Sequence, residues 1–393
     1  MGASRNRWNI AVLAGLLWLA GCAHYDDPYY VHSVWRPQGG GESHAVVFYL
    51  TNRRPSPGMP GGFSYLPADT PSCGSIGVTI PAAKLPGGDD RFGTVDKPQP
   101  AACGTSFESF AEQVAGAARA AQCRRVLIFV HGFDTGFETA VLRTGQLKTD
   151  AQFPCPAVAF SWASTGKRDD YLGDEAESRK SEPLFARLVR DLVQRGLQPE
   201  IAAHSLGARL ALAGLASLAG DPATRNPAAI GEVILYAADI DAGPGDDAFE
   251  RDAAAIKPFV QRITIYASDE DAALEMSRRL HGGARLGRQP EANRRFAEPG
   301  RVDVIDASDA PADTDGHDYY GLSYEALSDM ALTLAGVPAA ARTHPFFGRA
   351  ATLTCEEENC GLNGPFALKV RWSRRPGPLL RLIRWLIPLL PAM

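Results

Sequence analysis

Five consecutive residues near the middle of the chain have the types and spacing of a nucleophile turn. Ala203-His204-Ser205-Leu206-Gly207 lies where a short apolar run gives way to a helical pattern. A serine on such a strand-to-helix turn, with small residues two positions before and after it, can present its hydroxyl to a carbonyl carbon. The amides at the start of the helix would face the oxyanion that forms. The pattern predicts that Ser205 is a nucleophile, and a helix-capping serine is the alternative.

An earlier turn has the composition of an oxyanion loop. Val130-His131-Gly132-Phe133 ends another short apolar run, and in hydrolases with this nucleophile turn such a loop supplies the second oxyanion amide. We expect the backbone N–H groups of Phe133 and Leu206 to form the pair. His131 precedes the nucleophile, so we interpret it as structural. A glycine turn without a catalytic role is the alternative.

The candidate general base follows from the order of residues along the chain. Hydrolases with this turn place the serine first, then the acid, then the histidine. Three of the eight histidines come late enough, namely His281, His317 and His344. We favour His317, because it stands in a glycine-preceded loop after the last predicted strand, and the other two remain alternatives.

The candidate acid is one of four aspartates that follow predicted strands. Asp269 and Asp271 follow one strand, and Asp239 and Asp241 follow the preceding one. The acid must accept the imidazole N–H, hold its tautomer and stabilise the imidazolium. We favour Asp271, with Asp239 as the alternative acid; for each of the four, a solvated or helix-capping aspartate is also possible.

Alternating patterns from about residue 107 indicate the fold class. Short, continuously apolar runs are typical of strands buried on both faces, and here they alternate with helical patterns. That alternation predicts an α/β fold of the α/β-hydrolase type, a mostly parallel, doubly wound sheet with helices on both faces. The predicted strands are 44–51, 126–130, 157–162, 200–203, 232–237, 262–267 and 302–305, and the predicted helices are 107–121, 137–150, 182–195 and 206–218.

The first residues have the pattern of an export signal. Residues 1–21 combine a basic start with an apolar run too short to span a bilayer, followed by Leu-Ala-Gly before Cys22. This predicts a lipoprotein signal peptide, with lipidation at Cys22; an ordinary secretory signal with an incidental cysteine is the alternative. Ala23 follows, where other lipoproteins retained in the inner membrane have aspartate. We therefore expect a cell-envelope protein, lipid-anchored in the outer membrane and facing the periplasm.

The remaining chain divides into three parts. A tether over 22–43, rich in Tyr, Pro and Gly, leads to the α/β-hydrolase domain over 44–336. A C-terminal extension follows over 337–393. It ends in an apolar, basic tail that is too short and too charged to span a membrane. The tail is predicted either to lie in the membrane interface or to pack on the domain.

Six cysteines remain once Cys22 is set aside, an even number in an oxidising compartment. Cys123 and Cys155 each precede a predicted strand at the same end of the sheet, which favours a disulfide between them. The predicted pairs are Cys123–Cys155, Cys355–Cys360 and, by elimination, Cys73–Cys103. Spacing leaves other connectivities open. A zinc site is the competing interpretation, and the lack of a close Cys-x-x-Cys argues against it.

Composition limits the classes of partner. The chain has 393 residues, 45% of them hydrophobic and 22% charged, with a net charge of −5. The length suits one large α/β domain with appendages. The charge balance has no basic patch of the kind that nucleic-acid binding requires, so no nucleic-acid partner is expected.

Over residues 44–322 the chain resembles the esterase/lipase-like α/β-hydrolases of a bacterial family of unknown function. The matching segments, in order, are 48–53, 77–81, 129–133, 160–162, 203–207, 237–241, 266–274 and 316–319. The resemblance supports Asp271 as the acid and His317 as the base. It implies no metal, no organic cofactor and no particular substrate. The chain departs from the family at Ala163 and Ala238, where proline is usual, and this affects loop shape more than chemistry.

These patterns together predict a lipid-anchored serine hydrolase of the esterase or lipase type. Its partners would be a small acyl or ester substrate and the membrane, reached through Cys22 and the C-terminal tail. The alternative is a non-catalytic envelope lipoprotein that uses a hydrolase fold as a binding scaffold, because fold alone does not fix function. A nucleophile, base and acid all in place argue against that alternative.

Overall fold

The structure is a computed structural model of the chain. It describes residues 43–80, 94–96, 101–103, 107–167, 169–243, 247–310, 312, 315–344, 351–355 and 364–369. The predicted signal peptide, Cys22, nearly all of the tether and the apolar tail lie outside the described residues. The predictions about them therefore stay predictions.

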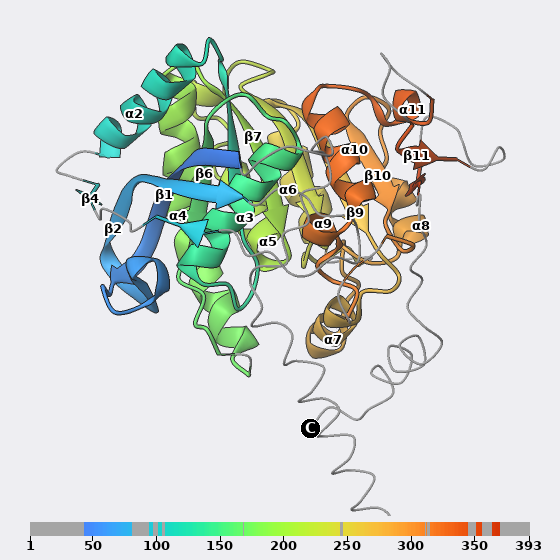
Figure 1. The fold of residues 1–393 in the computed structure, drawn as a ribbon. Helices are drawn as coiled ribbons and strands as arrows, with labels where there is room; N and C mark the ends of the chain where they lie inside the picture. Colours follow the sequence, from blue (N-terminus) through green and yellow to red (C-terminus); the bar gives the residue numbers. More distant parts are fainter. Residues whose placement is uncertain are drawn as a thin grey trace, which may run out of the picture.

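A single twelve-stranded sheet forms the centre of the molecule (Figure 1). The strands are β1 (Ser43–Pro55), β2 (Phe63–Ile80), β3 (Thr94–Val95), β4 (Ala101–Ala102), β5 (Arg125–Val130), β6 (Ala157–Ser161), β7 (Gln198–His204), β8 (Ile230–Tyr236), β9 (Val260–Ala267), β10 (Val302–Asp306), β11 (Leu353–Thr354) and β12 (Phe366–Leu368). Their order is β11-β12-β10-β9-β8-β7-β5-β6-β1-β2-β3, with β4 paired to β2. The last two strands come from the extension predicted after residue 337 and continue the sheet beside β10.

The middle of the sheet is parallel, as predicted. All neighbours from β1 through β6, β5, β7, β8, β9 and β10 to β12 run parallel. The outer pairs β1–β2, β2–β3, β2–β4 and β11–β12 are antiparallel. The chain leaves β5 for β6 on one side and returns to β7 on the other. In open α/β sheets, ligands bind outside the carboxyl ends of the strands at such a switch point.

Helices cover both faces of the sheet, which confirms the doubly wound arrangement. They are α2 (Phe107–Ala120), α3 (Phe137–Asp150), α4 (Tyr171–Gln194), α5 (Leu206–Ala216), α6 (Ala248–Ile256), α7 (Ala272–His281), α8 (Pro290–Asn293), α9 (Tyr319–Leu322), α10 (Tyr324–Leu334) and α11 (Ala339–Arg342). The apolar sides of α2, α4, α5 and α6 bury one face, and those of α3, α9 and α10 bury the other. None of the helices in the described part of the chain is long and apolar enough to cross a membrane.

Two elements differ from the sequence-based expectation. The helix predicted over 182–195 begins at Tyr171 instead, because the side chain of Asp170 accepts a hydrogen bond from the Gly173 amide and caps the helix. Pro183 lies inside this helix. The second difference is β2, which covers residues 63–80 and is absent from the strands predicted above; its antiparallel pairing with β1 makes this segment a strand.

Two of the predicted disulfides are formed. Cys73 pairs with Cys103, with Cα atoms 4.9 Å apart, and Cys123 pairs with Cys155, with Cα atoms 5.7 Å apart. The second bond joins the segments that precede β5 and β6, as their predicted positions required. Cys360 lies outside the described residues, so the third pair stays a prediction.

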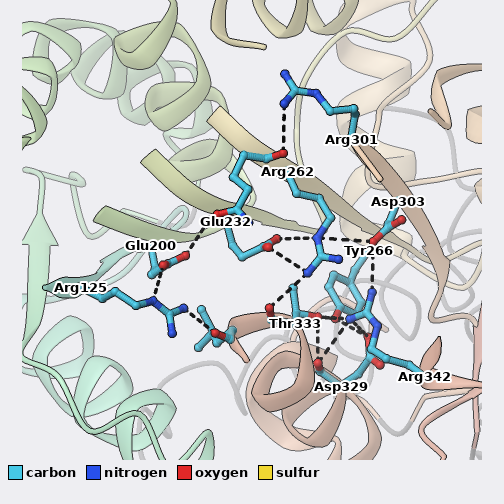
Figure 2. Close-up of polar contacts among 12 residues, drawn as sticks. Arg125, Glu200, Glu232, Arg262, Tyr266, Arg301, Asp303, Asp329, Thr333 and Arg342 are labelled. Atoms are coloured by element: carbon cyan, nitrogen blue, oxygen red, sulfur yellow. Dashed lines mark hydrogen bonds and ion pairs between the residues drawn. The ribbon is translucent and has the colours of Figure 1, made fainter. Parts of the chain in front are cut away.

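Charged side chains connect the amino ends of five parallel strands, β5, β7, β8, β9 and β10 (Figure 2). Arg125 Nε donates to Glu200 Oε1 at 2.6 Å, and Glu200 Oε2 accepts from the Glu232 amide at 2.6 Å. Arg262 Nη2 lies 2.8 Å from Glu232 Oε1, and its Nε lies 3.7 Å from Asp303 Oδ2. We call this chain of contacts the amino-edge network. Because each buried charge has an opposite partner, the network offsets part of its desolvation cost.

The amino-edge network also holds the end of α10. Arg125 donates to the carbonyl oxygen of Leu334, and Arg262 Nη2 donates to that of Thr333 at 3.3 Å. The last carbonyls of a helix have no partner within the helix, and positive charge there is favourable. The network therefore fixes α10 to the sheet.

Glu232 makes stability depend on pH. Burial raises the pKa of Glu232 to about 7, and the nearby Glu200 charge adds to the effect against the attraction of Arg262. The folded protein thus holds this proton more tightly than the unfolded chain, where the pKa is near 4.5. The stabilising contribution is complete below pH 4.5 and is lost as pH rises through about 7. The difference between the two pKa values corresponds to roughly 3 kcal/mol in the free energy of unfolding.

We expect Glu232→Gln to remove this contribution to the pH dependence. Denaturant unfolding at several pH values should show that the free energy of unfolding of the wild type falls more between pH 4.5 and 7 than that of Glu232→Gln. Glu298→Gln is the control, because Glu298 is half-exposed in a surface pair with Lys257. Parallel curves for the wild type and Glu232→Gln would contradict the assignment.

Candidate active site

Ser205 occupies a strained turn between β7 and α5. Its backbone φ is 53° and its ψ is −122°, a region that side-chain-bearing residues rarely adopt and that is often found at functional sites. The turn depends on Gly207. A Cβ there would lie 2.2 Å from the carbonyl oxygen of His131 and 2.6 Å from that of Val130. The turn can therefore approach the end of β5 only with glycine at this position.

Backbone hydrogen bonds fix the strained turn from the next strand. The Ser205 amide donates to the Tyr236 carbonyl at 3.0 Å, and the Ser205 carbonyl accepts from the Asp239 amide at 3.2 Å. Tyr236 is the last residue of β8, and Asp239 lies in the loop that follows it. These bonds help to keep the turn in its unfavourable conformation, and they place Ser205 at the carboxyl edge of the parallel sheet.

The loop after β5 packs directly against this turn. A Cβ on Gly132 would lie 2.9 Å from the Ser205 Cβ. Leu206 opens α5, so its amide is one of those that have no acceptor within the helix. The structure thus brings together the two segments that carry the predicted oxyanion amides, those of Phe133 and Leu206, at the switch point between β5 and β7.

His131 is buried and neutral. Its Nδ1–H donates to the Gly132 carbonyl at 2.8 Å, and Nε2 faces the Arg53 Nη2 at 3.4 Å. The ring stacks on Trp162, whose Nε1–H donates to the His131 carbonyl at 2.8 Å. Burial, together with the Arg53 charge, lowers the pKa of His131 to about 3. These contacts fit the expectation that His131 shapes the loop.

Arg53 is a site residue that sequence reasoning missed. This side chain is fully buried at the end of β1. Its Nε donates to Ser161 Oγ at 2.9 Å, and its other nitrogens donate to the carbonyls of Ser164 and Thr135 at 3.3 and 2.5 Å. It therefore connects β1 to the loops after β5 and β6. Arg53 stands in a segment that resembles the family, but its residue type alone does not indicate this role.

His317 and Asp271 form a buried pair. The Nδ1–H of His317 donates to Asp271 Oδ2 at 2.7 Å, and both side chains are almost completely buried. The other oxygen of Asp271 accepts from the Leu274 amide at 2.8 Å and caps α7. Gly316 adopts a φ of 76°, and a Cβ there would lie 2.4 Å from the Glu270 carbonyl. Glycine thus allows the histidine loop to reach the aspartate loop.

His204 joins this pair to the nucleophile turn. The His204 and His317 ring centroids are 4.5 Å apart, and His204 Nε2 lies 3.3 Å from the His317 carbonyl oxygen. Tyr320 also stacks on His204, with the ring centroids 4.3 Å apart. Burial lowers the pKa of His204 well below its usual value, so the ring is neutral. The His317 loop therefore packs against the residue that precedes Ser205.

Asp239, the alternative acid, has a different set of partners. Its Oδ2 accepts from the Tyr171 hydroxyl, and its Oδ1 accepts from Ser277 Oγ at 2.7 Å. Arg209 Nη2 and Arg285 Nε lie 3.5 and 3.6 Å from the same Oδ1. Asp239 thus ties the beginning of α4 to α5 and α7, and the carboxylate beside His317 is that of Asp271.

The remaining candidates lie elsewhere. His281 Nε2 lies 3.1 Å from Glu175 Oε2. His344 follows α11, whose last residue, Arg342, forms a buried ion pair with Asp329 of α10 at 3.0 Å. Asp241 is partly exposed, and Asp269 is exposed. Among the described residues, no three or more His, Cys, Asp or Glu side chains gather in a way that could hold a metal ion.

Comparison with known families agrees with this architecture. A family model described as an alpha/beta hydrolase of unknown function (DUF900) matches residues 107–332, more than half of the chain. The protein is a member of this family. The match spans β5 to β10 and includes Ser205, Asp271 and His317. A search of curated proteins gives no match. The chain is thus an α/β-hydrolase by fold and family.

The low pKa of His131 can be measured. We expect its ring nitrogens to give the spectrum of a neutral imidazole from pH 8 down to pH 5 in ¹⁵N-detected NMR, because burial and Arg53 both disfavour the charged form. Comparison with His131→Gln assigns the signals. A titration of this ring with a midpoint between pH 5 and 8 would contradict the conclusion that burial and Arg53 keep it neutral.

Proposed function

We propose that this protein is a serine hydrolase that cleaves an ester or related acyl substrate through an acyl-enzyme. The observation that carries the proposal is the strained turn at Ser205, which packs against an oxyanion-type loop and whose preceding residue, His204, contacts His317 of the buried His317–Asp271 pair. Strain of this kind, next to an oriented imidazole, fits a nucleophile turn. A helix-capping serine does not need it, and Ser205 makes no side-chain cap of α5.

Each part of the reaction has a residue to perform it. With Nδ1 bound to Asp271, the Nε2 of His317 is the atom that accepts the Ser205 proton as Oγ attacks the acyl carbon. The amides of Phe133 and Leu206 stabilise the oxyanion. The imidazolium then gives its proton to the leaving group. A water, deprotonated by the same nitrogen, attacks the acyl carbon and releases the acid, which restores Ser205.

Asp271 orients His317 and balances the imidazolium charge during both steps. The chain's own residues supply every group that this reaction needs, so the proposal involves no metal or organic cofactor. The proposed location is the cell envelope. It rests on the lipoprotein signal that ends at Cys22 and on the two disulfides, which require an oxidising compartment. Lipidation and the apolar tail would keep the enzyme at the membrane.

We expect a fluorophosphonate to label Ser205 alone. The wild-type protein should take up the reagent and Ser205→Ala should not, because removing the nucleophile of a triad costs several powers of ten in rate. Ser217→Ala, at the far end of the same helix, is the matched control and should be labelled like the wild type. Equal labelling of Ser205→Ala would overturn the mechanism, and an unlabelled wild type would favour the binding scaffold.

A pair of substitutions distinguishes the two aspartates. Asp271→Asn keeps the cap on α7, because asparagine caps helices about as well. It loses the carboxylate beside His317 and should lower turnover by about 10⁴ while the protein stays folded. Asp239→Asn disturbs the contacts with Tyr171 and Ser277 and should cost roughly 1–3 kcal/mol of stability, with turnover close to normal. Ester hydrolysis and denaturant unfolding measure both, and the reverse pattern would make Asp239 the acid.

A further inference from the structure

The loop that carries His317 depends on neighbouring elements for its position. It connects β10 to the short helix α9, and its described residues form neither helix nor strand, namely 307–310, 312 and 315–318. Both His317 and Tyr320, the second residue of α9, are nevertheless almost completely buried. A buried segment without regular backbone pairing needs partners from the elements around it. The side chains that hold this segment therefore also determine where the imidazole lies.

Two side chains on α3 reach this segment. Arg143 and Gln146 lie three positions apart, so they share one face of the helix, and both are almost completely buried. Arg143 Nη2 donates to Asp318 Oδ2 at 3.0 Å. Gln146 Nε2 donates to the Gly321 carbonyl oxygen at 2.9 Å, and Gln146 Oε1 accepts from Arg143 Nη1 at 2.7 Å. We call Arg143, Gln146 and Asp318 the α3 clamp.

The α3 clamp also contacts the aromatic ring between its two attachment points. The guanidinium carbon of Arg143 lies 5.2 Å from the ring centroid of Tyr320, at a distance where a cation is attracted to an aromatic face. A Cβ on Gly321 would overlap the Arg143 Nη1 atom, so glycine is needed for this approach. Because Tyr320 stacks on His204, the clamp also reaches the residue that precedes Ser205.

The carboxylate of Asp318 is directed to α3. Asp318 is the N-cap residue of α9, but its side chain makes no cap hydrogen bond to that helix. Its side chain is 23% exposed and that of Arg143 is 8% exposed. An ion pair with one nearly buried partner is screened less by solvent and salt than a surface pair. The contact between Arg143 and Asp318 is thus suited to hold the loop in one place.

We propose that the α3 clamp positions His317 for proton transfer, so that Arg143 and Asp318 are positioning residues of the proposed reaction. Asp318 directly follows His317, and holding its side chain restrains the backbone to which the imidazole is attached. The hydrogen bond to Asp271 restrains the ring itself. The effect on turnover rests on the proposed function, whereas the effect on the hydrogen bond between His317 and Asp271 does not.

The clamp connects the imidazole to the oxyanion-type loop through one helix. α3 begins at Phe137, directly after this loop, and carries Arg143 in its second turn. The Phe133 amide and the His317 loop are therefore both attached to α3, one at its start and the other through the clamp. In active sites a displacement of about 1 Å can lower the rate by roughly 10². A helix that holds both groups keeps their separation constant.

A structural ion pair without influence on the reaction is the alternative, and the fold allows a test. The Tyr319 hydroxyl donates to the Tyr266 carbonyl at 2.9 Å and accepts from the Ala237 amide at 2.9 Å. These bonds join α9 to the ends of β8 and β9 independently of α3. We therefore expect the loss of the clamp to loosen His317 while α9 stays in place. Asp318→Ala is the milder variant, because this side chain is partly exposed and caps no helix.

Proton NMR of the full-length protein tests the clamp without catalysis. The Nδ1 proton of His317, in a short buried bond to Asp271, should resonate far downfield and exchange slowly with water. His317→Gln lacks this proton and assigns the signal. Asp318→Ala and Arg143→Gln should broaden the signal or abolish it through faster exchange. Arg190→Gln is the matched control and should retain it, because Arg190 forms an arginine–aspartate pair with another loop, at 2.7 Å.

Hydrolysis of a soluble ester measures the effect on the proposed reaction. Asp318→Ala should lower kcat by about 10- to 100-fold and change KM by less than about twofold, because the clamp acts on proton transfer and not on substrate binding. Arg143→Gln should have the same effect, and the double variant should lose no more than either single variant, since both remove one contact. Arg143→Lys should recover most of the lost kcat, because lysine keeps a positive charge beside Asp318.

Three results would overturn the proposal. The first is a His317 signal that is unchanged in both clamp variants, and the second is a wild type without a slowly exchanging proton on this ring. The third is a normal kcat in folded Asp318→Ala, which would make the ion pair purely structural. If the wild type hydrolyses no ester, the proposed function fails, and the proton signal still decides whether the clamp holds His317.

Discussion

The buried carboxylate of Asp271 joins three parts of the structure. A buried charge is tolerated only where hydrogen-bond donors replace water, and here the donors are the imidazole of His317 and the amide of Leu274. One donor belongs to the loop after β10 and the other to the first turn of α7. The same carboxylate therefore orients the candidate base and caps the first turn of α7.

Buried charges also form ion pairs at the opposite, amino edge of the sheet, where they connect strands to a helix. The amino-edge network joins strands to the end of α10 and contains no candidate nucleophile. α10 follows the His317 loop after only the short helix α9, so its anchoring limits the movement of that loop. The amino edge thus supports the framework, and the carboxyl edge carries the strained turn, the oxyanion-type loop and the histidine–aspartate pair.

Much of this arrangement can be predicted from the sequence because the signals are local. Apolar runs and helical spacing give the parallel sheet, and the small residues around Ser205 give the turn, which Gly207 alone permits beside β5. The start of α4 was misjudged by eleven residues, because a polar stretch becomes helical when Asp170 caps it and its carboxylates find partners in the fold. Arg53 was missed because nothing near it in the sequence indicates the loops it joins.

The fold class and the strained turn at Ser205 could be predicted from the sequence, as could the chain order of the candidate serine, acid and histidine. These features could be predicted because strand pairing, helix periodicity and turn stereochemistry depend on residues close together in the chain. The tertiary structure shows that the carboxylate beside His317 is that of Asp271 and not that of Asp239, although both follow strands that end at the same edge. The choice depends on which carboxylate meets an imidazole 46 positions away in the chain, and that is set by how the loops pack.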